Sequence, residues 1–158
     1  MAKRGSGGSS EALAQVDAFL AKYTPEMEKL ARACLKKMRQ RLPGAFELVY
    51  DNYNALVFGF GPSERASEAL FSLALFPRWI SLFFLQGAHL HDPYGILKGS
   101  GNQVRHIVLT SASDLDRADI VDLMATARIN AKKDIDPKCG GTLIVKSIAA
   151  KQRPRRPA

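Results

Sequence analysis

The residue types best suited to binding a ligand lie together in one glycine-containing segment. Adjacent small residues leave backbone N–H groups open, and such a segment can form a concavity that binds an anion, while flanking cations add charge. The candidate residues are Lys98, Gly99, Ser100, Gly101, Asn102 and Arg105. The segment matches neither nucleotide-loop pattern, G-x-x-x-x-G-K-[ST] or G-x-G-x-x-G. An ordinary turn before a strand has the same composition and is the commoner use of it, so both interpretations stay open.

Three aromatic residues, Tyr50, Tyr53 and Trp79, form a second candidate group. Together with Asn54 they combine apolar rings with polar tips, which suits the lining of a cleft on a sheet face. Burial in a plain core is the more frequent use of side chains such as Tyr50 and Trp79. The two groups together predict a small, anionic ligand held between the glycine segment and an aromatic sheet face.

The histidines and cysteines give no comparable prediction. His89 and His91 lie two residues apart beside Asp92, a spacing that would suit a metal only in a strand, whereas a loop is expected there. Cys34 and Cys139 have no metal or redox spacing, which favours a reducing, cytoplasmic location. No spacing indicates a catalytic constellation, so we expect no enzyme activity, no resident metal and no cofactor.

Two helices are expected ahead of these residues. Apolar residues recur at three- and four-residue steps from position 13 to 23, after a serine cap at 9 or 10. Thr24 and Pro25 have the N-cap and first-turn types that begin a second helix, which Leu42-Pro43-Gly44 ends.

The periodicity then changes to two, which is typical of strands. Segments 46–51, 55–60, 70–76, 79–85 and 103–110 predict an antiparallel sheet of about five strands. Segments 70–76 and 79–85 are apolar on both faces, so a helix, a partner subunit or a ligand is expected to cover the second face.

A C-terminal helix from Ser113 to about Lys133 completes the predicted fold, because acids lie early and basic residues late in that segment. The predicted class is therefore α+β. We expect an unstructured tail over residues 1–9, a domain over 10–135, and an extension over 136–158 with a possible short strand at 142–148 and a basic end.

The net charge of +8 lies mostly in the terminal segments. Seven positive charges occur there without a neighbouring acid, which leaves the body at about +1 if both ends stay outside the fold. Nucleic-acid binding is therefore expected only as weak contact by the Lys151–Arg156 end. No apolar run is long enough to cross a bilayer, and no secretory signal is expected.

Three separated segments resemble the YdhG-like domain family: Tyr50-Asp51-Asn52-Tyr53, Trp79-Ile80-Ser81-Leu82 and Leu97-Lys98-Gly99-Ser100-Gly101-Asn102-Gln103-Val104-Arg105-His106. The resemblance covers roughly residues 17–131. Most of that family has no characterised function. One branch is described as a frataxin-like intracellular iron chaperone, with helices packed on one side of an antiparallel sheet.

Three functions are compatible with these patterns. The first is a non-catalytic module that binds a small, possibly anionic ligand. The second, implied by the resemblance, is a frataxin-like iron chaperone, although such proteins use a ridge of carboxylates and the first two helices hold four acids against seven basic residues from 22 to 41. The third is a homodimer that buries the second, apolar sheet face.

Overall fold

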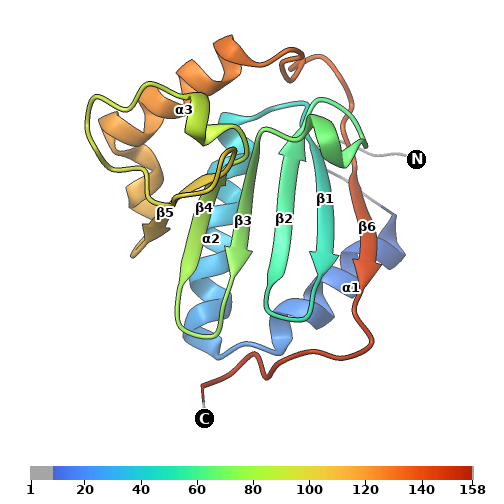
Figure 1. Ribbon diagram of the computed structural model, residues 1–158. Coiled ribbons are helices and arrows are strands. Elements are labelled where there is room, and N and C mark those ends of the chain that lie inside the picture. The colour runs from blue at the N-terminus through green and yellow to red at the C-terminus, as the bar shows by residue number, and fades with distance from the viewer. Residues whose placement is uncertain (1–8, 158) are drawn as a thin grey trace.

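The computed structural model describes residues 9–157, which form three α-helices, three short 3₁₀-helices and a six-stranded sheet. The elements in chain order are α1 (Ser10–Ala21), α2 (Pro25–Arg41), β1 (Phe46–Asp51), β2 (Leu56–Gly61), η1 (Ala66–Glu68), β3 (Phe71–Leu75), β4 (Ile80–Phe84), η2 (Gly87–His89), β5 (Arg105–Leu109), η3 (Ala112–Asp116), α3 (Ala118–Asn130) and β6 (Leu143–Ile148). The predicted α+β class is confirmed, with two N-terminal helices, a sheet and a C-terminal helix (Figure 1). No helix within residues 9–157 is long and apolar enough to span a membrane. The expected tail over 1–9 lies outside the described residues except for Ser9.

Side-chain caps begin the first two helices where the sequence predicts. The Ser9 hydroxyl accepts a hydrogen bond from the backbone N–H of Ala12 at 3.0 Å. The Thr24 hydroxyl accepts one from the backbone N–H of Met27 at 3.2 Å, and Pro25 occupies the first turn of α2. Each cap satisfies a backbone donor that the helix itself leaves free.

The sheet has the strand order β5-β4-β3-β2-β1-β6. The first five strands pair antiparallel, as expected, whereas β6 adds to the edge of β1 in parallel. A parallel neighbour needs a long crossover, which residues 110–142 supply as they carry the chain from β5 at one edge to β6 at the other. The short strand predicted at 142–148 is confirmed as β6, and the sheet is mixed.

The predicted helix from Ser113 to Lys133 is wrong in its first turn. Residues 112–116 form η3, and α3 begins only at Ala118. The Asp114 carboxylate accepts hydrogen bonds from the Thr110 and Ser111 backbone N–H groups at 2.8 and 3.3 Å, and Ser111 provides the capping box. These local bonds compete with a continuous helix and separate the two segments.

The helices bury one face of the sheet. In the view of Figure 1, α1 and α2 lie behind the strands and α3 lies beyond their upper end. Large apolar side chains from β2, β3 and β4, including Phe58, Leu73 and Leu82, form the core on this side. Tyr23 joins that core, with its hydroxyl donating to the Leu75 carbonyl at 2.7 Å and accepting from the Leu56 N–H at 3.2 Å.

No α-helix within the described residues covers the opposite face, which is turned toward the viewer in Figure 1. At one end, the loop over residues 62–69 packs onto Gly59 and Gly61, because a Cβ on Gly61 would lie 2.8 Å from the Ala69 Cα atom. The rest of this face carries Tyr50, Val57, Ser72, Ala74, Phe76, Ser81 and Phe83. We call this uncovered part the open face.

Candidate functional site

The glycine segment is held by its own residues. Lys98 forms an antiparallel bridge with His106, with both backbone N–H···O distances at 2.9 Å. The Arg105 guanidinium donates to the carbonyls of Gly101 and Val104 at 2.6 and 2.9 Å. The segment therefore adds a short strand to the edge of β5, and Arg105 closes the loop.

Lys98 and Arg105 do not converge on one ligand. Directly paired antiparallel residues share a face, so Lys98 lies on the same side of the sheet as His106, which is the side of the open face. Arg105 is adjacent to His106 in the strand and lies on the opposite side, paired with Phe84. The structure thus separates the two cations that were expected to neutralise one anion, while Gly99, Ser100, Gly101 and Asn102 lie exposed in the loop between them.

The aromatic candidates gather on the open face. Tyr50 is half-buried there, whereas Tyr53 and Trp79 are 45% and 43% exposed. Trp79 stacks on Phe76, with ring centroids 4.6 Å apart and an interplanar angle of 18°. The interpretation of Trp79 as a plain core residue is therefore wrong, because the β3–β4 turn places it at the sheet surface.

A shallow hollow of about 530 Å³ runs along this surface. Its floor is made of small side chains such as Ser72 and Ala74, which leave room above the sheet. Aromatic rings and amides border it, and the lining consists of Asn52, Tyr53, Asn54, Ala55, Val57, Ser72, Ala74, Phe76, Phe83 and Leu85. Tyr53 alone among the three predicted aromatic residues is part of this lining.

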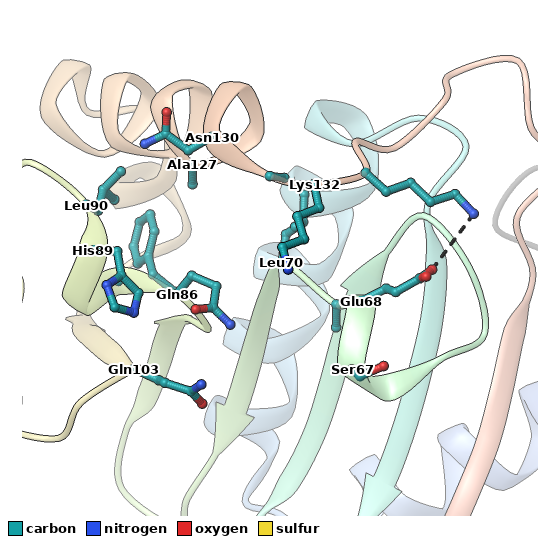
Figure 2. A pocket seen from close by; sticks show the side chains of 15 residues that line it. Ser67, Glu68, Leu70, Gln86, His89, Leu90, Gln103, Ala127, Asn130 and Lys132 are labelled. Atoms are coloured by element: carbon teal, nitrogen blue, oxygen red, sulfur yellow. Dashed lines mark ion pairs between the residues drawn. The ribbon is translucent and has the colours of Figure 1, made fainter.

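A second and more enclosed cavity of about 510 Å³ lies at the other end of the sheet, beneath α3 (Figure 2). We call it the sheet-end pocket. Its apolar surface comes from Leu70, Phe84, Leu90 and Ala127. Its polar side chains are Ser67, Glu68, Gln86, His89, Gln103, Asn130, Lys132 and Lys133. Gln86, His89 and Gln103 come from the β4–β5 side, opposite Asn130 at the end of α3.

The acid of this pocket has partners, whereas one of its lysines has none within residues 9–157. Glu68 accepts a hydrogen bond from the Ser63 hydroxyl at 2.5 Å and lies 3.8 Å from the Lys133 Nζ atom. The Ser63 hydrogen bond, aided by the charge of Lys133, lowers the pKa of Glu68. Lys132 makes no ion pair or side-chain hydrogen bond to the described part of the chain. Figure 2 shows it reaching from the segment after α3 toward Leu70.

Sequence reasoning missed the sheet-end pocket. Its lining comes from four separate segments, and only the fold brings these together. The sequence pattern indicates only a charge complement to the helix end for Lys133 and a histidine pair with His91 for His89. None of the glycine-segment candidates lines the pocket, although Gln103, between Asn102 and Arg105, does.

The metal and thiol alternatives gain no support. Residues 9–157 contain no group of three His, Cys, Asp or Glu side chains that could hold a metal ion. Asp92, beside His91, accepts a hydrogen bond from the Leu97 backbone N–H at 2.9 Å and so orders its own loop. Burial raises the pKa of the Cys34 thiol to about 11, which leaves this side chain protonated and inert at neutral pH.

The assumption that both ends of the chain stay outside the fold is wrong for Arg155. Arg155 is 4% exposed, and its guanidinium donates to the Asp51 carboxylate at 2.8 Å. Lys22 donates to the same carboxylate at 2.8 Å and to the Gln152 side chain at 2.9 Å. The segment therefore packs around the β1–β2 turn, and its charges belong to the folded body.

Comparison with known proteins identifies no relative. No family model, curated protein or solved structure matches the chain. The resemblance to the YdhG-like family thus stays a prediction, and function is inferred below from the site itself.

Proposed function

We propose that the protein is a non-catalytic module that binds a small anionic ligand with an apolar body in the sheet-end pocket. The observation that carries this proposal is the combination in one cavity of an apolar surface with Lys132, which has no ion pair or side-chain hydrogen bond within residues 9–157. This retains the class of ligand expected from the sequence and changes its place.

The size and lining of the cavity support a ligand of this kind. Small-molecule sites usually enclose about 300–1,000 Å³ and combine apolar walls with a few polar groups. The sheet-end pocket, at about 510 Å³, has Leu70, Phe84 and Leu90 as apolar walls. Side-chain amides of Gln86 and Gln103 add donors and acceptors that would fix the orientation of a ligand.

The charge of the pocket favours an anion. The pocket lining contains two lysines and one carboxylate. That carboxylate, Glu68, already has the Ser63 hydroxyl and Lys133 beside it. An anionic head group near Lys132 would gain a charge-assisted hydrogen bond. A cation at the same point would meet like charge.

The arrangement does not favour catalysis. Ser67 and His89 both line the pocket, but no hydrogen bond joins them among the described residues, and no carboxylate there orients His89. An activated nucleophile needs a base within hydrogen-bond reach that a third group orients. Binding without chemical conversion is the simpler use of these residues.

Octanoate and octylamine test this proposal, because they share an alkyl chain and carry opposite charges. In two-dimensional NMR titrations, octanoate should shift the amide signals of Leu70, Leu90 and Ala127 saturably, and octylamine should not. Lys132→Gln should weaken octanoate binding about ten- to 150-fold, since charge-assisted hydrogen bonds contribute roughly 1.5–3 kcal/mol. Lys36→Gln, at an exposed position on α2, is the matched control. Equal shifts with both probes, or none at millimolar octanoate, would remove the case for an anion site.

A further inference from the structure

The open face combines exposed aromatic rings with a floor of small side chains. Tyr53 and the Phe76–Trp79 stack lie at the end formed by the two hairpin turns. Phe83 lies farther along the same face, with its ring centroid 5.4 Å from that of His106. Several flat rings therefore border one shallow hollow whose floor, Ser72 and Ala74, leaves space for planar groups.

The described strand residues of this face include no acid, and the acids Glu64 and Glu68 lie in the loop over residues 62–69 that packs on its other end. The register places Glu47 and Asp51 on the helix-covered side, and no acid occurs among the described strand residues of the opposite side. Lys98 extends the row that contains Phe83 and His106, and Arg78 lies in the β3–β4 turn beside Trp79. Both cations lie outside the lining of the hollow, Lys98 beyond His106 in the same row and Arg78 next to Trp79 in the turn.

The C-terminal segment adds a cation at a fixed position. The Arg153 backbone N–H donates to the Tyr53 carbonyl at 2.9 Å, and its guanidinium lies 5.7 Å from the centre of the Tyr53 ring. The buried Arg155–Asp51 ion pair anchors this segment two residues farther on. The basic end of the chain is therefore held against the aromatic hollow by the fold.

We propose that the open face binds single-stranded nucleic acid. Bases would stack on Tyr53 and on the Phe76–Trp79 pair, and phosphates would contact Arg153, Arg78 and Lys98. Stacking on aromatic side chains within a positively charged groove is the general means by which proteins hold single strands without strong sequence preference. The side-chain amides of Asn52 and Asn54 border the hollow and can hydrogen-bond to base edges.

A single strand fits this surface better than a duplex does. The rings can stack only on bases whose faces are free, and in a duplex those faces are already stacked on one another. The hollow is shallow and lies flat on a sheet, so it offers no projecting helix or ribbon that would enter a major groove. This proposal is independent of the sheet-end pocket, which lies at the other end of the sheet.

Binding is measured with the full chain and three fluorescein-labelled probes: a ten-nucleotide oligouridylate, a ten-nucleotide oligothymidylate and a ten-base-pair DNA duplex. Fluorescence anisotropy should show either single strand binding at least tenfold more tightly than the duplex. Unlabelled single strand should also quench Trp79, the only tryptophan in the chain. Tighter binding of oligouridylate than of oligothymidylate would add a contact to the ribose 2′-hydroxyl.

Two variants separate stacking from charge. Tyr53→Ala should weaken single-strand binding about five- to hundredfold and leave its salt dependence unchanged. Arg153→Gln should lower the slope of log affinity against log salt by about 0.7, the value for one lost phosphate contact. Tyr94→Ala is the control for the first, because Tyr94 is 47% exposed and hydrogen-bonds to Asp122 on α3, and Lys36→Gln is the control for the second.

Three outcomes would overturn the proposal. One is equal affinity for duplex and single strand with no effect of Tyr53→Ala, which would show attraction by charge alone. Another is no binding by any probe at 50 mM salt and high micromolar protein. The third is a dimer that light scattering detects, that shields the fluorescence of Trp79 from a soluble quencher, and that does not dissociate with oligonucleotide. The open face would then belong to a second copy.

Discussion

The two faces of the sheet differ in the charged side chains that they carry and in how these are paired. The helix-covered face contains Glu47 and Asp51, both about 1% exposed or less, and each is paired with a basic side chain from a helix or from the C-terminal segment. The open face has no acid among its described strand residues, and the cations around it stay accessible. The difference teaches that the buried carboxylates of this protein serve its structure, whereas its unpaired cations are free to meet a ligand.

Removal of a buried carboxylate should have the largest effect. Asp51→Ala leaves the Arg155 guanidinium buried without a counterion, and breaking such a pair costs roughly 3–5 kcal/mol. Urea unfolding followed by circular dichroism should show this loss. Asp17→Ala breaks an exposed pair with Arg32 and should cost no more than about 1 kcal/mol. Similar losses for the two variants would contradict the contrast between buried and exposed pairs.

Protonation of Asp51 at low pH should lower the free energy of unfolding by less than its replacement by alanine does. Burial alone would raise the pKa of Asp51, but hydrogen bonds from Lys22, Arg155 and Gln152 outweigh it and hold the pKa below the ordinary value of 3.8. The lowered pKa stabilises the fold at pH values above 3.8, and this contribution is lost as the pH falls through the folded-state pKa.

The measurement is the free energy of unfolding in urea from pH 6 down to pH 2. Asp51→Asn should unfold more easily at pH 6 and show a shallower fall with acid than the parent protein. Parallel curves for the two proteins would mean that Asp51 doesn't contribute to the acid response.

Truncation on the open face should have the smallest effect on stability. Tyr53→Ala removes an exposed ring from a turn and should change the free energy of unfolding by no more than about 0.5 kcal/mol. Trp79→Ala loses the stack on Phe76 and should cost about 1 kcal/mol. Thermal and urea unfolding measure both. A loss of several kcal/mol for Tyr53→Ala would place that ring in the core and remove the contrast between the faces.

Local sequence signals predict most of the fold. The serine and Thr-Pro caps set the starts of α1 and α2. Two-residue periodicity locates β1, and continuous apolar runs locate β3 and β4, because such signals act over a few residues. The predicted start of α3 is wrong at Asp114, because this carboxylate can cap either a continuous helix or a separate short turn.

The candidate site was less predictable, because it depends on register and on contacts between distant segments. Lys98 and Arg105 are close in sequence, but pairing of Lys98 with His106 sends them to opposite faces. Arg155 belongs to a basic run that is usually solvated, and only the proximity of Asp51, 104 residues away, draws it inside. Neither relation leaves a pattern in the sequence.

Lys22, after α1, and Arg155, after β6, both donate to the Asp51 carboxylate, so the two ends of the fold are coupled through this side chain. The Ala149 N–H donates to the Asp51 carbonyl at 2.8 Å, and the Glu47 N–H donates to the Thr142 carbonyl at 3.0 Å, so neither proton meets solvent while β6 is attached. Detachment of that strand, together with the segment after it, would also remove Arg155 from Asp51. The Lys22 ammonium, at the end of α1, would lose its hydrogen bond to Gln152 and keep the one to Asp51. Hydrogen exchange along the outer edge of β1 would then report one joint opening of the first helix and the last strand, rather than the fraying of two independent ends.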